Sequence, residues 1–137
     1  MSSRTAPPGG WPPPERTELG GEPVRLGPLA EATAERYFAA HPEDLERYGD
    51  VARDWELHDT LHLLNWAVGD AEGYVDLGRQ VSWLAGVLEA RGFPLEHLAD
   101  NLELAADVVS EQLPAGAPVA ERLRRAAALV RGRGSSR

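Results

Sequence analysis

The sequence predicts an all-α fold, a bundle of four or five packed helices of which a globin-like arrangement is one variant. In several long segments the apolar residues recur at steps of three and four, which is the period of one helix face. No segment alternates convincingly between apolar and polar residues, as a half-buried strand does. Glycine and proline stand between the periodic segments, where these residues end or begin helices.

The chain of 137 residues suits one domain with terminal extensions. Residues 1–27 are dense in proline and glycine, which predicts a disordered arm of polyproline II character outside the core. We expect the helical domain over residues 28–131. Residues 132–137, composed of Arg, Gly and Ser, are expected to form a disordered tail.

The first expected helices are separated by proline and glycine. One begins at Pro28, and the next begins at Pro42, because proline disfavours helix at the residue before it. The segment from Pro42 either continues into the long helix expected over residues 51–68 or is interrupted at Gly49, and Gly69 is the expected C-terminal cap of the long helix.

Three helices are expected in the second half of the chain. Residues 71–91 carry an apolar stripe with 3, 4, 3, 4 spacing, which consists of Tyr74, Leu77, Val81, Leu84 and Leu88. Pro94 opens a helix that runs to about residue 113, and a short final amphipathic helix follows Pro118. This order of elements is typical of a bundle.

Composition excludes several kinds of chemistry. The chain has no Cys, which excludes disulfides, thiolate catalysis and Cys-ligated metal centres, and it has no Lys, which excludes Schiff-base catalysis on lysine. No apolar run is long enough for a membrane span and no secretory leader pattern is present, so we expect a cytoplasmic protein.

The formal net charge of −8 is unevenly distributed. Residues 28–113 hold 18 Asp or Glu against five Arg, whereas residues 121–137 hold six Arg and one Glu. An acidic body repels nucleic acid and anionic membrane surfaces at long range, so neither is an expected partner.

The segment over residues 54–68 is the densest in residue types that can do chemistry. It has the sequence D-W-E-L-H-D-T-L-H-L-L-N-W-A-V. At 100° per residue, one side of this helix makes the expected core stripe, namely Leu57, Leu61, Leu64 and Val68. A second arc, distinct from that stripe, consists of Trp55, His58, His62, Asn65 and Trp66. Glu56 and Asp59 fall on the third side, beside Leu63.

Four interpretations of the second arc compete. The first is a structural face on which Trp and His pack and make single hydrogen bonds. The second is a pocket for a planar or amphipathic small molecule, with aromatic walls and a few polar groups. The third is a surface for self-association or for a protein partner. The fourth interpretation is a metal site.

The metal hypothesis rests on His58 and His62. Their i, i+4 spacing places two imidazoles on one helix face and resembles the H-E-x-x-H motif of the zincin metalloproteases. Asp59 stands where that family has its catalytic Glu. His97 would be the third ligand if its helix lies alongside.

Two stretches carry resemblances to known families. G-D-A-E-G-Y-V-D-L-G-R-Q-V-S-W-L-A-G-V-L-E-A-R-G-F-P-L-E-H-L-A-D-N-L resembles the helical bundle of cobalamin-binding bacterial light sensors and corrinoid proteins. Y-F-A-A-H-P-E-D-L-E-R-Y and G-F-P-L-E-H-L are similar to segments of bacterial globins and of haem-free, globin-like stressosome sensor domains. Both resemblances imply a sensory or regulatory helical module. They imply a tetrapyrrole as a cofactor, whereas His58 and His62 indicate a metal ion. Neither cofactor is indicated by a complete motif.

The leading functional hypothesis is therefore a non-catalytic sensor or regulatory module. Its second arc is expected to contact a small hydrophobic or planar ligand, or a protein partner that includes a second copy of the chain. One alternative is a metal-binding protein or metalloenzyme that uses His58 and His62. The other alternative is a structural protein-interaction adaptor.

Overall fold

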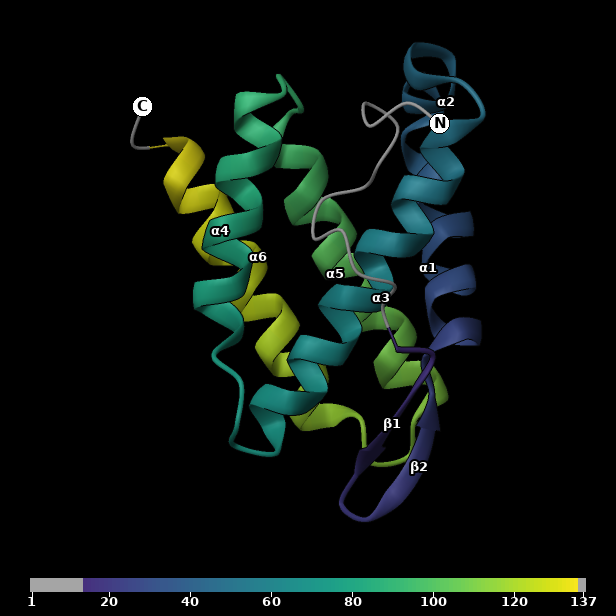
Figure 1. The fold of residues 1–137 in the computed structure, drawn as a ribbon, viewed down its shortest axis with the longest axis vertical. Helices are drawn as coiled ribbons and strands as arrows, with labels where there is room; N and C mark the ends of the chain where they lie inside the picture. The colour runs from purple at the N-terminus through teal and green to yellow at the C-terminus, as the bar shows by residue number, and fades with distance from the viewer. Residues whose placement is uncertain (1–13, 136–137) are drawn as a thin grey trace.

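The computed structural model describes residues 14–135, which form six helices and one two-stranded hairpin (Figure 1). In chain order the elements are β1 (Arg16–Leu19), β2 (Glu22–Arg25), α1 (Leu26–Ala40), α2 (Pro42–Tyr48), α3 (Val51–Ala71), α4 (Leu77–Ala90), α5 (Leu95–Gln112) and α6 (Ala117–Ser135). The mostly helical fold is confirmed. Among the described residues there is one helix more than the upper limit of the prediction, because the short α2 forms a helix of its own.

Helices α3 and α5 lie in the middle of the bundle, with α1 on one side and α4 and α6 on the other (Figure 1). Fully buried leucines from four helices meet in the core, namely Leu63, Leu64, Leu84, Leu102 and Leu123. The predicted stripe of α4 is buried from Leu77 to Leu88, but Tyr74 lies before the helix and is 70% exposed. None of the helices described is both long and apolar enough to cross a lipid bilayer.

Part of the N-terminal arm, for which the sequence predicts disorder, forms a β-hairpin. Residues 1–13 of that arm lie outside the described residues, whereas β1 and β2 pair as antiparallel strands next to α1. Gly20 and Gly21 make the turn with φ angles of 61° and 82°, which L side chains rarely adopt. Val24 and Leu26 are buried with the main core, so for these two residues the predicted exclusion from the core is wrong.

Helix α3 is longer than predicted. It continues through Gly69, the expected cap, and ends at Ala71. A Cβ at Gly69 would lie 2.5 Å from Cγ2 of Val75, so the glycine lets the following loop pack closely against the helix. Asp70 then accepts hydrogen bonds from the Leu77 backbone N–H at 2.8 Å and from Arg122 Nε at 2.7 Å. The loop over residues 72–76 is thereby held against α6.

The basic end of the chain is part of the folded bundle. Helix α6 extends to Ser135, where the sequence predicts a disordered tail from residue 132, and residues 136–137 lie outside the described residues. Arg131 contacts three carboxylates of α5, those of Glu96, Asp100 and Glu103, at 2.7–3.0 Å. Arg124 pairs with Asp107 of α5 as well, so basic side chains of α6 offset part of the acidic charge of α5.

Candidate functional site

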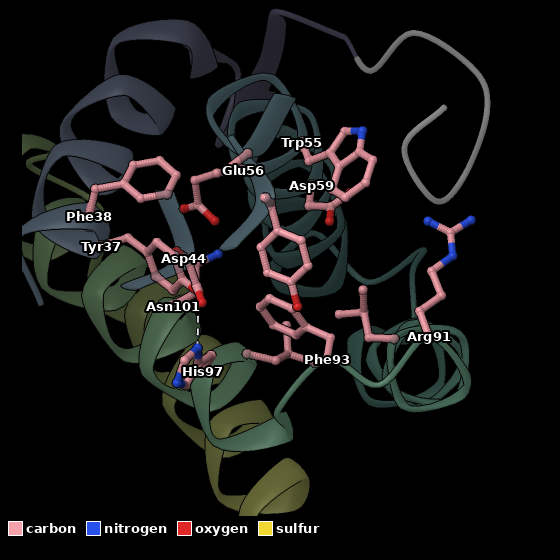
Figure 2. A pocket seen from close by; sticks show the side chains of 14 residues that line it. Tyr37, Phe38, Asp44, Trp55, Glu56, Asp59, Arg91, Phe93, His97 and Asn101 are labelled. Atoms are coloured by element: carbon pink, nitrogen blue, oxygen red, sulfur yellow. Dashed lines mark hydrogen bonds and ion pairs between the residues drawn. The ribbon is translucent and has the colours of Figure 1, made fainter. Parts of the chain in front are cut away.

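An aromatic pocket lies at the α2 end of the bundle, away from the hairpin (Figure 2). Its cavity volume is about 80 Å³, which exceeds what a single water molecule needs. Five aromatic side chains contribute to its walls, namely Tyr37, Phe38, Tyr48, Trp55 and Phe93. Such walls suit a flat or alkyl group.

Local sequence features bring these rings together. Tyr37 and Phe38 occupy the last turn of α1, just before the chain turns at Pro42 into α2. Gly49 has a φ of 73°, which ends α2 and lets Tyr48 face Trp55 in α3 at a ring distance of 6.2 Å. On the opposite side Gly92, with a φ of 77°, ends the turn after α4 and places Phe93 against the pocket.

Two buried polar atoms in the pocket walls have no hydrogen-bond partner among the described residues. They are the Tyr48 hydroxyl and Oδ1 of Asn101. Asn101 is 3% exposed, and its Nδ2 donates to Oγ1 of Thr60 at 3.1 Å. An unsatisfied buried acceptor costs about 1–3 kcal/mol, so these atoms favour a polar occupant of the pocket.

Glu56 and Asp59 add two carboxyl groups to the pocket. Burial raises the pKa of Glu56 well above its ordinary value. The hydrogen bond that Thr60 donates at 2.9 Å lowers this pKa, while the negative charges of Asp59 and Asp44 raise it further. Burial also raises the pKa of Asp59, while His58 and Arg91 lower it. Figure 2 shows Arg91 at the outer side of the pocket, away from Glu56. Glu56 is thus the carboxyl group that most lacks a positive partner.

The raised pKa of Glu56 predicts that this carboxyl group contributes less to stability at neutral pH than in mild acid. Above the ordinary pKa of 4.5, the unfolded chain loses this proton while the folded protein retains it, so the free energy of unfolding falls as pH rises through the folded pKa. We expect Glu56→Gln to raise the free energy of unfolding by at least about 1 kcal/mol at pH 7.5 and to change it little at pH 4.

Urea unfolding at a series of pH values measures this effect. The exposed Glu46 in α2 provides the matched control Glu46→Gln, which should leave the pH dependence unchanged. An equal gain at pH 4 and pH 7.5, or no gain at either, contradicts the explanation based on burial of the carboxylate.

The predicted arc is divided by the structure. Trp55 lines the pocket, but the other four members lie farther along α3, outside the pocket walls. The His58 and His62 rings meet edge to face with centroids 4.7 Å apart, and His62 stacks on Trp66 at 5.5 Å. Asn65 is half-buried on the same helix, and Trp66 packs against the main core.

Potential metal ligands gather elsewhere than predicted. Within residues 14–135, the group of three or more His, Asp or Glu side chains close enough to share an ion consists of His41, Glu43 and His97. His58 and His62 are not in it. Metal binding by His58 and His62 stays a prediction. His97, the expected third ligand of that site, contacts the carboxylates of Glu43 and Asp44 of α2.

Sequence reasoning missed most of the pocket. Helical spacing places Glu56 and Asp59 on the third side of α3, beside Leu63, and the structure shows that Leu63 is fully buried. A signal for this face exists in the sequence: Ala52, Thr60, Leu63 and Ala67 recur at helical spacing, and all four are buried. The two carboxylates belong to the same stripe, so the stripe could have identified them.

No known protein family, no curated protein and no solved structure matches this chain in the comparisons made. The globin-like variant of the bundle and the resemblances to sensor modules accordingly stay predictions.

Proposed function

We propose that this protein is a non-catalytic regulatory module that binds a small organic cation with a flat or alkyl apolar part. The proposal depends on one observation: aromatic rings surround carboxyl groups and unsatisfied polar atoms in a single pocket. An aromatic face attracts a cation through the negative face of its ring, and a carboxylate adds a charge-assisted hydrogen bond.

The polar atoms of the pocket favour a ligand that donates hydrogen bonds. Oδ1 of Asn101 only accepts, and Glu56 only accepts once it is ionised, which a bound cation favours by lowering the pKa of this buried carboxyl group. A primary or secondary ammonium group donates two or three hydrogen bonds and also supplies the positive charge that Glu56 lacks. The net charge of −8 adds a long-range attraction for cations.

A regulatory role is supported by the way α2 closes the pocket. Asp44 and Tyr48 of this seven-residue helix line one side of the pocket, and the other sides come from α1, α3, α5 and the end of α4 with the turn that follows it. A ligand that contacts both α2 and α3 would stabilise α2 in its docked position, since binding favours the state that makes the contacts. The position of α2 is then a signal that a partner protein can recognise.

Three related probes test the proposal: benzylamine, benzyl alcohol and benzoate, which share a ring and differ in charge. Saturation-transfer NMR and calorimetry should show benzylamine binding about 10- to 100-fold more tightly than benzyl alcohol, with benzoate weakest. The double variant Glu56→Gln/Asp59→Asn should remove the preference for the cation. Ala52→Phe, which fills the pocket from α3, should abolish binding of all three probes.

Trp83→Ala is the matched control, because Trp83 lies in α4 and is 49% exposed outside the pocket. Equal binding of benzoate and benzylamine, or binding that persists in Ala52→Phe, overturns the proposal. If no probe binds while His62→Ala or Trp66→Ala changes the oligomeric state in sedimentation experiments, the protein-interaction adaptor takes its place.

A further inference from the structure

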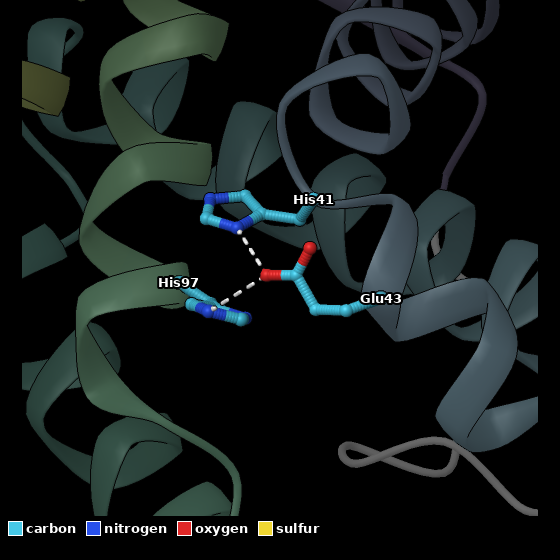
Figure 3. A group of neighbouring side chains, drawn as sticks. All are labelled: His41, Glu43 and His97. Carbon is cyan, nitrogen blue, oxygen red and sulfur yellow. Dashed lines mark hydrogen bonds and ion pairs between the residues drawn. The ribbon is translucent and has the colours of Figure 1, made fainter.

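Three side chains from two distant segments of the chain meet beside the pocket (Figure 3). His41 precedes α2, Glu43 lies in its first turn, and His97 lies in the first turn of α5. Oε2 of Glu43 is 3.2 Å from Nδ1 of His41 and 3.6 Å from Nε2 of His97. The two imidazole rings lie against each other, with centroids 4.0 Å apart.

Each imidazole is also held on its other nitrogen by a second carboxylate. Nε2 of His41 lies 2.9 Å from Oδ2 of Asp100, and Nδ1 of His97 lies 3.0 Å from Oδ2 of Asp44. Those carboxylates are themselves held, because Tyr37 donates its hydroxyl proton to Asp44 and Arg131 donates to Asp100. A carboxylate behind each imidazole is the arrangement that orients histidine ligands in metal sites.

The hydrogen-bonding capacity of histidine explains why a cation fits between these groups. A neutral imidazole has one N–H and one nitrogen lone pair. If Asp100 accepts the N–H of His41 and Asp44 accepts the N–H of His97, the remaining lone pair of each ring is directed toward the carboxylate of Glu43. An ionised carboxylate has no proton to donate to these lone pairs. A cation among the three atoms turns this repulsion into coordination.

We propose that His41 Nδ1, His97 Nε2 and a carboxylate oxygen of Glu43 form a binding site for a divalent first-row transition-metal ion of the Zn²⁺ class. Two imidazoles and one carboxylate are a common donor set for such ions. The three atoms lie within 4.8 Å of one another. Ligands about 2.1 Å from a tetrahedral Zn²⁺ lie about 3.4 Å apart, so small side-chain movements complete the site.

The exposure of the ligands leaves room for a fourth one. The His41 and His97 side chains are 13% and 15% exposed, while Glu43 is 57% exposed. Solvent therefore reaches the ion from the Glu43 side, where a water molecule or an external donor completes the coordination. The ion would link α2 to α5 next to the organic-cation pocket, because His97 contributes to both sites. The metal proposal does not depend on the proposed organic ligand.

The test uses the full chain without an affinity tag, stripped of metal with a chelator and titrated with Zn²⁺ by calorimetry at pH 7.5. We expect one Zn²⁺ per chain, and with Co²⁺ as a second probe we expect visible absorption bands of a four-coordinate ion. His97→Ala and Glu43→Gln remove one ligand each and should weaken Zn²⁺ binding by at least about 10-fold, while Asp100→Asn should weaken it about 10- to 100-fold through His41.

The double variant His58→Ala/His62→Ala is the matched control, because it removes two imidazoles that lie outside the cluster. It should leave the Zn²⁺ affinity within about twofold, as expected for groups that do not ligate the ion. Glu43 is exposed, so Glu43→Gln tests the site even if His97→Ala does not fold. The proposal is overturned if the wild-type chain binds no Zn²⁺ at 100 µM, if Glu43→Gln binds as tightly as the wild type, or if the control variant loses the ion.

Discussion

Replacing Asp44 by alanine is expected to lower the free energy of unfolding by about 3 kcal/mol, a large effect for one surface helix. Asp44 is 4% exposed and accepts hydrogen bonds from the Tyr37 hydroxyl and His97. Alanine leaves both of these donors without their acceptor. Because these contacts join α2 to α1 and α5, we expect α2 to lose its docked position first.

Chemical denaturation measures the free energy, and hydrogen exchange of the α2 amides reports local opening. Asp44→Asn retains an oxygen acceptor for Tyr37 and should cost about half as much. Glu46→Ala, an exposed change in the same helix, should cost less than about 0.5 kcal/mol. Equal effects of Asp44→Ala and Glu46→Ala contradict a structural role for this network.

Replacing Leu102 by alanine is expected to lower the free energy of unfolding by about 3–4 kcal/mol. Leu102 is completely buried in the middle of α5, and it belongs to the core cluster to which α1, α3, α4 and α6 also contribute. The truncated side chain loses its burial energy and leaves a cavity that the rigid surroundings fill only in part.

Thermal and urea unfolding of Leu102→Ala check this value. Leu129→Ala in α6 makes the same chemical change at a site that is 46% exposed, and it should cost less than about 0.5 kcal/mol. A cost below about 1 kcal/mol for Leu102→Ala contradicts the close packing of the core around α5.

The two proposed sites share residues at the α2 end of the bundle. Asp44 and His97 line the aromatic pocket, and their hydrogen bond also holds one imidazole of the proposed metal site. A metal ion that fixes α2 would therefore shape one wall of the pocket before an organic ligand binds. Binding of Zn²⁺ and of benzylamine should then be coupled, with each one strengthening the other by the same factor.

The candidate site was predictable from the sequence only in part. Local spacing places Trp55 on the predicted binding face, and it lines the pocket, while its role in binding stays a prediction. His41 was interpreted only as the residue before a proline, and no spacing rule connects it with His97. Their contact depends on how α5 packs against the end of α1, which is a property of the whole bundle.

The sequence by itself determined the helical class, the start of α2 at its proline and most of the buried α4 stripe. These features arise from local periodicity and from backbone preferences that act within a few residues. The tertiary structure alone decided that the hairpin joins the core, that the Glu56 face of α3 borders a pocket, and that His41, Glu43 and His97 meet. A central helix is buried on more than one side, so its own pattern does not show which polar residues face a pocket.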